Sequence, residues 1–184
     1  MRAEMGARPG GESVERLDGG LYRSASPEAT VRLGIALGGL LRPGDVIVLS
    51  GDLGAGKTRL TSGVARGLGD EAPVTSPTFT IMCVHGGGRI PLYHFDLYRL
   101  DDPAQLDDVG IYDVLEGEGA CLVEWGDLFS DELGDERLDI EIRRDVASAA
   151  PGAEPARLVR LTARGARAEE LADALDAAVR GLEG

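Results

Sequence analysis

The sequence is poor in cysteine and aromatic residues, and it has no long apolar run. Its 2 cysteines, Cys83 and Cys121, have neither the C-x-x-C spacing nor the histidine neighbourhood typical of a metal site. Each lies in an apolar run, which favours buried thiols in strands. No apolar run reaches the ~18 residues of a membrane span, and no charged-then-apolar leader is present. We therefore expect a cytoplasmic protein with no membrane partner.

Positive charge is also scarce. The chain has 19 Lys and Arg residues against 32 Asp and Glu residues, which gives a formal net charge of −13. Binding to the nucleic-acid backbone depends on Lys and Arg side chains that neutralise phosphates. A chain this acidic repels those phosphates, so we expect no autonomous nucleic-acid binding.

The remaining composition is that of a soluble globular protein, with 43% hydrophobic and 28% charged residues in 184. This length suits one domain that can bury a sizeable core. Residues 1–20 have several glycines, scattered charge and no apolar period, which predicts a disordered tail. Residues 21–184 are predicted to form a single domain.

The only lysine of the chain, Lys57, lies in the stretch GDLGAGKT at residues 51–58. This stretch fits the phosphate-loop pattern of a glycine, four free positions, then Gly-Lys and Ser or Thr. With this composition, chance would produce the pattern on the order of 10⁻³ times per chain. An apolar run at 45–50 precedes it, and apolar residues at helical spacing follow it to Leu68. The stretch is therefore predicted to join a buried strand to a helix.

The residue types in this loop suit a nucleoside triphosphate bound with Mg²⁺. Glycines let the backbone turn its N–H groups toward phosphates, and the following helix adds the positive end of its dipole. Lys57 would contact the β- and γ-phosphates, and the Thr58 hydroxyl would bind Mg²⁺. The predicted nucleotide-binding residues are Asp52, Leu53, Gly54, Ala55, Gly56, Lys57 and Thr58.

The rest of the chain predicts an α/β fold of the three-layer phosphate-loop type. A helix begins at Ser26-Pro27 and ends before Arg42-Pro43-Gly44. Residues 78–84 and 90–97 form an antiparallel hairpin around Gly86-Gly87-Gly88. A buried strand at 120–124, late strands at 139–143 and 157–162 and a terminal helix at 168–182 complete the predicted elements. The sheet is therefore expected to be mixed and mostly parallel, with an antiparallel hairpin.

Two carboxylates follow apolar runs and could complete a phosphate-loop site. Glu124 closes the run at 121–123, and Asp96 lies at the end of the run at 92–95. Such a site needs an acidic residue that holds the Mg²⁺ shell or positions the attacking water. Capping and salt-bridge roles are the alternatives for both residues.

Residues near these carboxylates have less specific patterns. The stretch TSPT at 75–78 is typical either of a switch segment that senses the γ-phosphate or of a proline-fixed turn. His94 in an apolar strand is more typical of a core residue than of a catalyst. Arg99 could stabilise phosphate charge or pair with a nearby aspartate. Trp125, the only tryptophan, could stack on a base or anchor the core.

Taken together, four motifs resemble the TsaE (YjeE) family. They are GDLGAGKT at 51–58, SPTF at 76–79, HFDLYRL at 94–100 and VEW at 123–125, and the resemblance spans about residues 24–145. The members of this family are bacterial ATPases required for the threonylcarbamoyl modification of adenosine in tRNA. The resemblance implies a small mixed-sheet fold, ATP and Mg²⁺ as cofactors, and action with the TsaB–TsaD pair. Any tRNA contact would then come through these partners.

The resemblance also implies roles for individual residues. Lys57 and the loop amides would hold phosphates, and Thr58 with Glu124 would hold Mg²⁺. Asp96 would be the catalytic carboxylate or share in the metal shell, and Thr78 would lie in the switch segment. Lys57, Asp96 and Thr78 are therefore the predicted catalytic residues, and Thr58 and Glu124 the predicted metal ligands.

Two other functions fit the same loop. A nucleoside or small-molecule kinase would need an acceptor pocket and a lid with arginines, for which Arg143-Arg144 is the one candidate. A nucleotide-gated assembly module would bind ATP to form a complex, and its hydrolysis would be incidental. The sequence leaves all three open, together with the adenine pocket and the oligomeric state.

Overall fold

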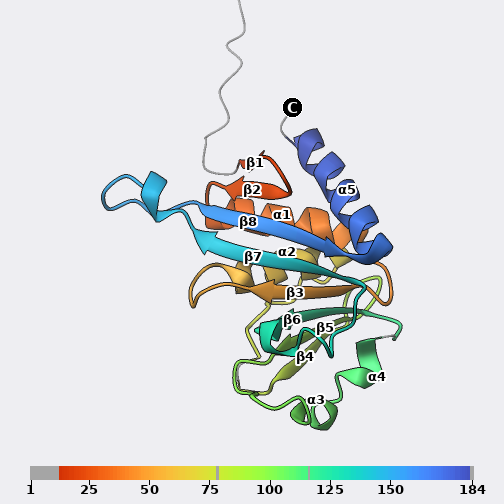
Figure 1. Ribbon diagram of the computed structural model, residues 1–184. Helices are drawn as coiled ribbons and strands as arrows, with labels where there is room; N and C mark the ends of the chain where they lie inside the picture. Colours follow the sequence, from red (N-terminus) through yellow and green to blue (C-terminus); the bar gives the residue numbers. More distant parts are fainter. Residues whose placement is uncertain (1–12, 78, 116, 183–184) are drawn as a thin grey trace, which may run out of the picture.

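The computed structural model describes residues 13–77, 79–115 and 117–182, which form one eight-stranded sheet with helices on it (Figure 1). The strands lie in the order β1-β2-β8-β7-β3-β6-β5-β4. Their bounds are β1 Val14–Arg16, β2 Leu21–Ser24, β3 Val46–Ser50, β4 Met82–His85, β5 Leu92–Asp96, β6 Ala120–Glu124, β7 Arg137–Arg144 and β8 Arg157–Arg164. The α-helices are α1 Pro27–Leu40, α2 Lys57–Leu68, α3 Gln105–Asp108, α4 Tyr112–Leu115 and α5 Gly165–Leu182, and the 3₁₀ helices are η1 Gly126–Phe129 and η2 Val146–Ser148.

The mixed sheet and the α/β fold are confirmed. Strands β7, β3, β6 and β5 are parallel at the centre, and the β4–β5 hairpin lies at one edge. Among the described strands the antiparallel pairings number 4 against 3 parallel ones, because β1–β2, β2–β8 and β7–β8 also pair antiparallel. The parallel part is therefore the centre of the sheet and not most of it.

Two predicted boundaries and one predicted burial need correction. Strand β1 falls inside the segment predicted to be a tail, and it pairs with β2; residues 1–12 of that segment lie outside the described residues. The first hairpin strand begins at Met82, because Phe79 and Thr80 form a turn in which the Thr80 and Ile81 amides donate to the Pro77 carbonyl. Cys121 is buried in β6 as expected, whereas Cys83 in the edge strand β4 is half-buried.

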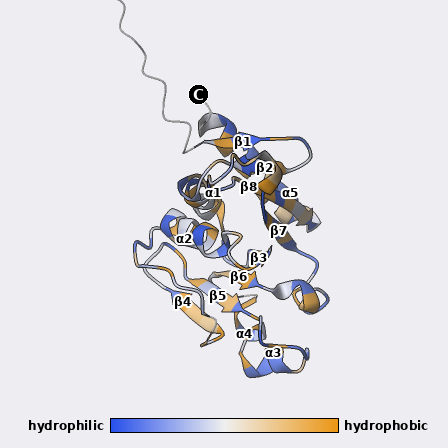
Figure 2. Cartoon of the chain, turned by 90° about the vertical axis from the view of Figure 1, so that its left-hand side faces the viewer, coloured by the Kyte–Doolittle hydropathy of each residue, from blue (hydrophilic) through white to orange (hydrophobic). Residues whose placement is uncertain are grey.

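The central strand β3 separates two hydrophobic clusters, which gives the three layers. Ile47 and Leu49 face α1, α2 and α5, whereas Val46 and Val48 face the segments 97–115 and 126–133 on the other side. Figure 2 shows the apolar residues of β4 and β5 and the short helices α3 and α4 below them. Both faces of β3 are buried, as expected for a parallel central strand.

Helices α1 and α2 contact each other through glycines that leave no room for side chains. A Cβ atom on Gly34 would lie 2.3 Å from the Leu60 carbonyl oxygen, and one on Gly63 would lie 2.2 Å from that of Val31. Gly38 and Gly67 are equally close to the opposite backbone. This contact fixes the start of α1 beside the phosphate loop that opens α2. Within the described residues, no helix combines the length and the apolar character that crossing a bilayer requires.

Candidate nucleotide site

The phosphate loop connects β3 to α2 as predicted, and its glycines have a structural reason. Gly51, Gly54 and Gly56 have positive φ angles of 141°, 75° and 118°. Gly51 is also confined, because a Cβ atom there would lie 2.3 Å from the Ile142 carbonyl oxygen. Gly56 precedes α2 without any side-chain cap, so the first amides of the helix stay available to an anion.

Lys57 is buried and lies folded back on the loop. Its Nζ donates to the Gly51 carbonyl at 2.6 Å and to the Asp52 carbonyl at 3.2 Å, and it lies 4.4 Å from the centroid of the Trp125 ring. Burial lowers the pKa of Lys57, and the charges of Glu124 and other carboxylates oppose this effect. Among the described residues the close partners of the ammonium group are carbonyls and a ring. Phosphate oxygens would solvate it better.

The two candidate carboxylates lie side by side at the carboxyl ends of β5 and β6. Asp96 and Glu124 are partners in the parallel register, and both are buried. The Ser76 hydroxyl donates to Asp96 Oδ2 at 2.9 Å, and the Tyr98 amide donates to Asp96 Oδ1 at 3.1 Å. The TSPT segment therefore touches the site through Ser76, whereas Thr78 lies outside the described residues.

Glu124 is held from inside the sheet by His94. The His94 Nε2 atom lies 3.0 Å from Glu124 Oε1, and the imidazole is fully buried. His94 Nδ1 has no hydrogen-bond partner among the described residues. His94 is thus a core residue, as its apolar strand predicts, and it also orients the Glu124 carboxylate.

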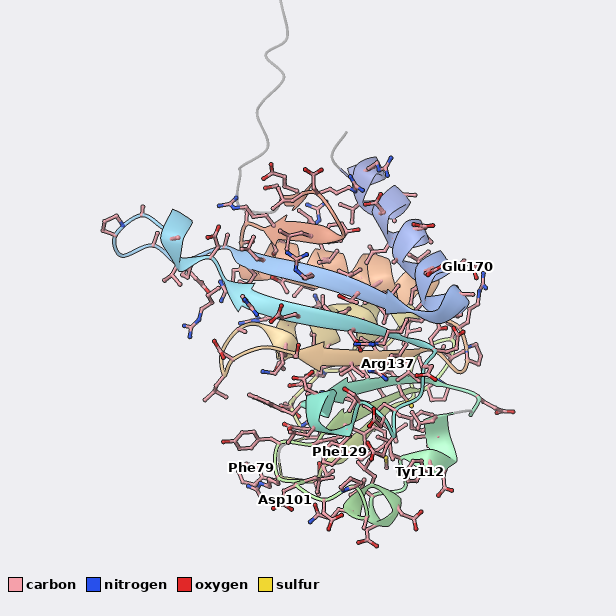
Figure 3. The ribbon with its side chains drawn as sticks, viewed as in Figure 1. Phe79, Asp101, Tyr112, Phe129, Arg137 and Glu170 are labelled. Carbon is pink, nitrogen blue, oxygen red and sulfur yellow. The ribbon has the colours of Figure 1, made fainter. Side chains whose placement is uncertain are left out.

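Trp125 and Tyr98 line the same cavity as the two carboxylates and contact each other. Trp125 has a left-handed backbone with a φ angle of 61°, and its ring centroid lies 5.2 Å from that of Tyr98. Arg99 instead lies over the ring of the exposed Phe79, 5.0 Å from its centroid. Figure 3 shows Phe79 projecting outward from the loop before β4.

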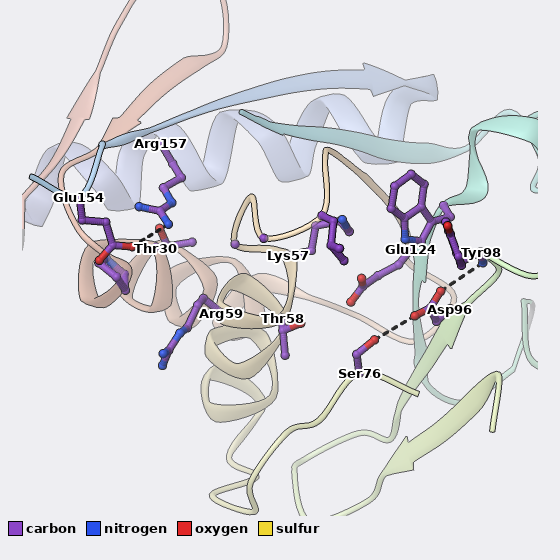
Figure 4. A pocket seen from close by; sticks show the side chains of 15 residues that line it. Thr30, Lys57, Thr58, Arg59, Ser76, Asp96, Tyr98, Glu124, Glu154 and Arg157 are labelled. Atoms are coloured by element: carbon purple, nitrogen blue, oxygen red, sulfur yellow. Dashed lines mark hydrogen bonds and ion pairs between the residues drawn. The ribbon is translucent and has the colours of Figure 1, made fainter. Parts of the chain in front are cut away.

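The phosphate loop, the two carboxylates, Tyr98 and Trp125 line a cavity of about 580 Å³ with two distinct ends (Figure 4). Asp96, Tyr98 and Glu124 lie at one end, Lys57 lies in the middle, and the other end is formed by residues outside the predicted site. These are Thr30, Glu154 and Arg157, and Pro27 also lines the cavity. Chain position near the loop is the one weak signal for Pro27 and Thr30, and no local pattern distinguishes Glu154 or Arg157.

The donor set of this cavity fits Mg²⁺. Thr58, Asp96 and Glu124 offer oxygen atoms, which are the ligands that hard cations prefer. No group of three or more His, Cys, Asp and Glu residues in the described part of the chain could hold a metal by itself.

Three comparisons with known proteins agree on one family. The family model for "Threonylcarbamoyl adenosine biosynthesis protein TsaE" matches residues 24–150. The tRNA threonylcarbamoyladenosine biosynthesis protein TsaE of Bacillus subtilis is 46% identical over 123 residues, which cover 67% of this chain and 77% of that protein. The protein of the same name from Treponema pallidum is 42% identical over 120 residues, which cover 65% of this chain and 88% of that protein.

A solved structure agrees with the sequence matches. The crystal structure of Bacillus subtilis YdiB superimposes with a TM-score of 0.68 at 38% identity, and the match covers 90% of this chain and 97% of that one. The matched residues 24–150 include the phosphate loop, Ser76, Asp96 and Glu124. The chain belongs to the TsaE family.

Proposed function

We propose that this protein binds and hydrolyses ATP with Mg²⁺ and supports the TsaB–TsaD pair in threonylcarbamoylation of tRNA adenosine. The single observation that carries the proposal is the buried pair of carboxylates, Asp96 and Glu124, next to the phosphate-loop lysine. The names of the relatives indicate the pathway, and the residues of the site indicate the chemistry.

Some residues of the site bind the nucleotide, and others take part in the hydrolysis. The loop amides and the dipole of α2 bind phosphates, and Lys57 leaves the Gly51 carbonyl to contact them. Bound Mg²⁺ supplies charge neutralisation on the phosphates, with Thr58 and Glu124 as its protein ligands. Asp96, held by Ser76 and the Tyr98 amide, orients the attacking water and accepts its proton.

The experiment that tests the proposal is ATP turnover measured with and without purified TsaB–TsaD. We expect slow release of phosphate by the protein alone and faster release with the partners. An absence of ATP binding would contradict the proposal. Transfer of labelled phosphate to a nucleoside would instead favour a kinase, although Arg143 pairs with Glu141 and does not line the cavity.

The substitution Asp96→Asn should separate hydrolysis from binding. The amide retains an oxygen for the Tyr98 N–H and can donate to the Ser76 hydroxyl, so the fold and the ATP affinity should be unchanged. It cannot accept a proton, so we expect hydrolysis to slow by at least about tenfold. Single-turnover phosphate release measures this.

The matched control for that variant is Asp101→Asn, which neutralises an exposed carboxylate in the following loop. It should hydrolyse ATP at the wild-type rate. Near-normal hydrolysis by Asp96→Asn would remove Asp96 from the catalytic role. Modification of tRNA by a hydrolysis-dead variant in a single round would favour the nucleotide-gated assembly module.

We also expect no tight complex between the isolated protein and tRNA at physiological salt. The net charge of −13 leaves too few cations to neutralise the phosphate backbone. Filter binding at roughly 0.15 M ionic strength measures this, with and without TsaB–TsaD. A submicromolar complex with the isolated protein would contradict the expectation.

A further inference from the structure

Arg157 is a buried cation that touches the phosphate loop from the far end of the chain. It begins β8, is 7% exposed, and lies outside the residues matched by the family model, 24–150. Its Nε donates to the Ala55 carbonyl at 3.2 Å. A Cβ atom built on Gly56 would lie 3.7 Å from the same Nε, so the guanidinium packs directly on the loop (Figure 4).

The hydrogen bond to Ala55 determines where the next amide points. In a trans peptide the C=O and the following N–H point in opposite directions. Because Arg157 binds the Ala55 carbonyl on one side of the peptide, the Gly56 N–H points to the opposite side, away from the guanidinium. Among the described residues that N–H has no hydrogen-bond acceptor. It is therefore available to a phosphate oxygen.

Arg157 is itself fixed by its own loop. Its Nη1 donates to the Pro155 carbonyl, and its Nη2 donates to Glu154 Oε1 at 2.8 Å. The backbone of Arg157 lies in the sheet, opposite Ser24 on one side and Arg144 on the other. The side chain is thus held from several directions before any nucleotide arrives.

We infer that Arg157 is a positioning residue that holds the Ala55–Gly56 peptide in its phosphate-binding orientation. The inference rests on the proposed binding of nucleotide phosphates at this loop. Two other roles for a cation here make different predictions. An arginine that contacts the nucleoside affects only ligands that carry one, and an arginine that contacts the γ-phosphate affects ATP but not ADP.

The test compares three ligands, ATP, ADP and inorganic triphosphate, on wild type and on Arg157→Ala, by competition against a fluorescent ADP analogue with Mg²⁺. We expect the affinity for all three to fall by the same factor, roughly tenfold, as for the loss of one hydrogen bond to a charged group. Arg157→Lys keeps the charge without the guanidinium geometry. Arg157→Lys should lose affinity for all three ligands by a common factor, as Arg157→Ala does. It serves as the test variant if Arg157→Ala does not fold.

The matched control is Arg160→Ala, which removes an exposed cation from the same strand and should bind all three ligands as wild type does. A loss for ATP and ADP that spares triphosphate would place Arg157 on the nucleoside and overturn the inference. A loss of affinity that spares ADP would place Arg157 on the γ-phosphate. Unchanged affinities would show that Arg157 has no role in binding. Either result would overturn the inference. If wild type binds none of the ligands, the proposed function fails before this inference is reached.

Discussion

Lys57→Ala is expected to lose ATP affinity by roughly 100-fold, as for the removal of two hydrogen bonds between a cation and phosphate oxygens. The variant should lose affinity for ATP without losing folding stability. Lys57 is the only lysine of the chain, and it lines the cavity. Titration of Mg²⁺–ATP into each variant measures the affinity.

The same variant should fold as well as wild type at neutral pH. Burial lowers the pKa of Lys57, so the unfolded chain binds this proton more tightly than the folded chain. The charged Lys57 therefore lowers the free energy of unfolding at every pH below its pKa in the folded protein. This destabilisation disappears as the pH rises from the pKa of Lys57 in the folded protein to the ordinary pKa of lysine. A melting temperature equal to or above that of wild type at pH 7 is the expected result.

The control for Lys57→Ala is Arg66→Ala, which removes one exposed positive charge from the last turn of the same helix. Its ATP affinity should match that of wild type. Two results would contradict the assignment: a Lys57 variant that still binds ATP tightly, or an equal loss in both variants, which would indicate a general effect of charge.

Gly63→Ala is expected to destabilise the fold by about 3 kcal/mol, at the upper end of what overpacking a core costs. The added methyl group would lie 2.2 Å from the Val31 carbonyl oxygen and 2.8 Å from Gly34 Cα, and backbone atoms cannot rotate away as a side chain would. The helices must separate, which shifts the start of α2 relative to Pro27 and Thr30. We therefore expect weaker ATP binding as well, and urea denaturation measures the stability.

Gly39→Ala is the matched control, because it makes the same substitution in α1 where a Cβ atom would meet nothing within 4 Å. Alanine favours the helix over glycine, so this variant should be more stable than wild type by about 0.5–1 kcal/mol. Equal stability of the two variants would show that the contact between α1 and α2 tolerates a side chain.

Local signals predicted several elements correctly. Ser26 caps α1 by accepting from the Ala29 amide, and Pro27 occupies its first turn, as the sequence indicates. Gly69 ends α2 in a left-handed conformation. The carboxylates at the ends of β5 and β6 lie together because those strands are parallel neighbours. Each of these features depends on residues close in sequence or on one strand pairing.

Other features had no local signal. Strand β1 is three residues long and forms against β2, so its glycine-rich surroundings predict no structure. The glycines of α1 and α2 have low helix propensity, so they argue against helices when the sequence is read alone. Their reason is the close contact between the two helices, which leaves no room for a side chain. The bond from His94 to Glu124 joins residues 30 positions apart, and the bond from Arg157 to Ala55 joins residues 102 positions apart.

The sequence by itself determined the phosphate loop, the strand before it, the helix after it and the two carboxylates that face it. These follow from local backbone requirements: glycine where φ is positive, alternating or continuous apolar runs, and charge at strand ends. Only the tertiary structure decided which distant groups hold those residues in place. Three hydrogen bonds do this: from Ser76 to Asp96, between His94 and Glu124, and from Arg157 to the Ala55 carbonyl. They depend on the order of strands in the sheet, which brings residues together regardless of their separation in the chain.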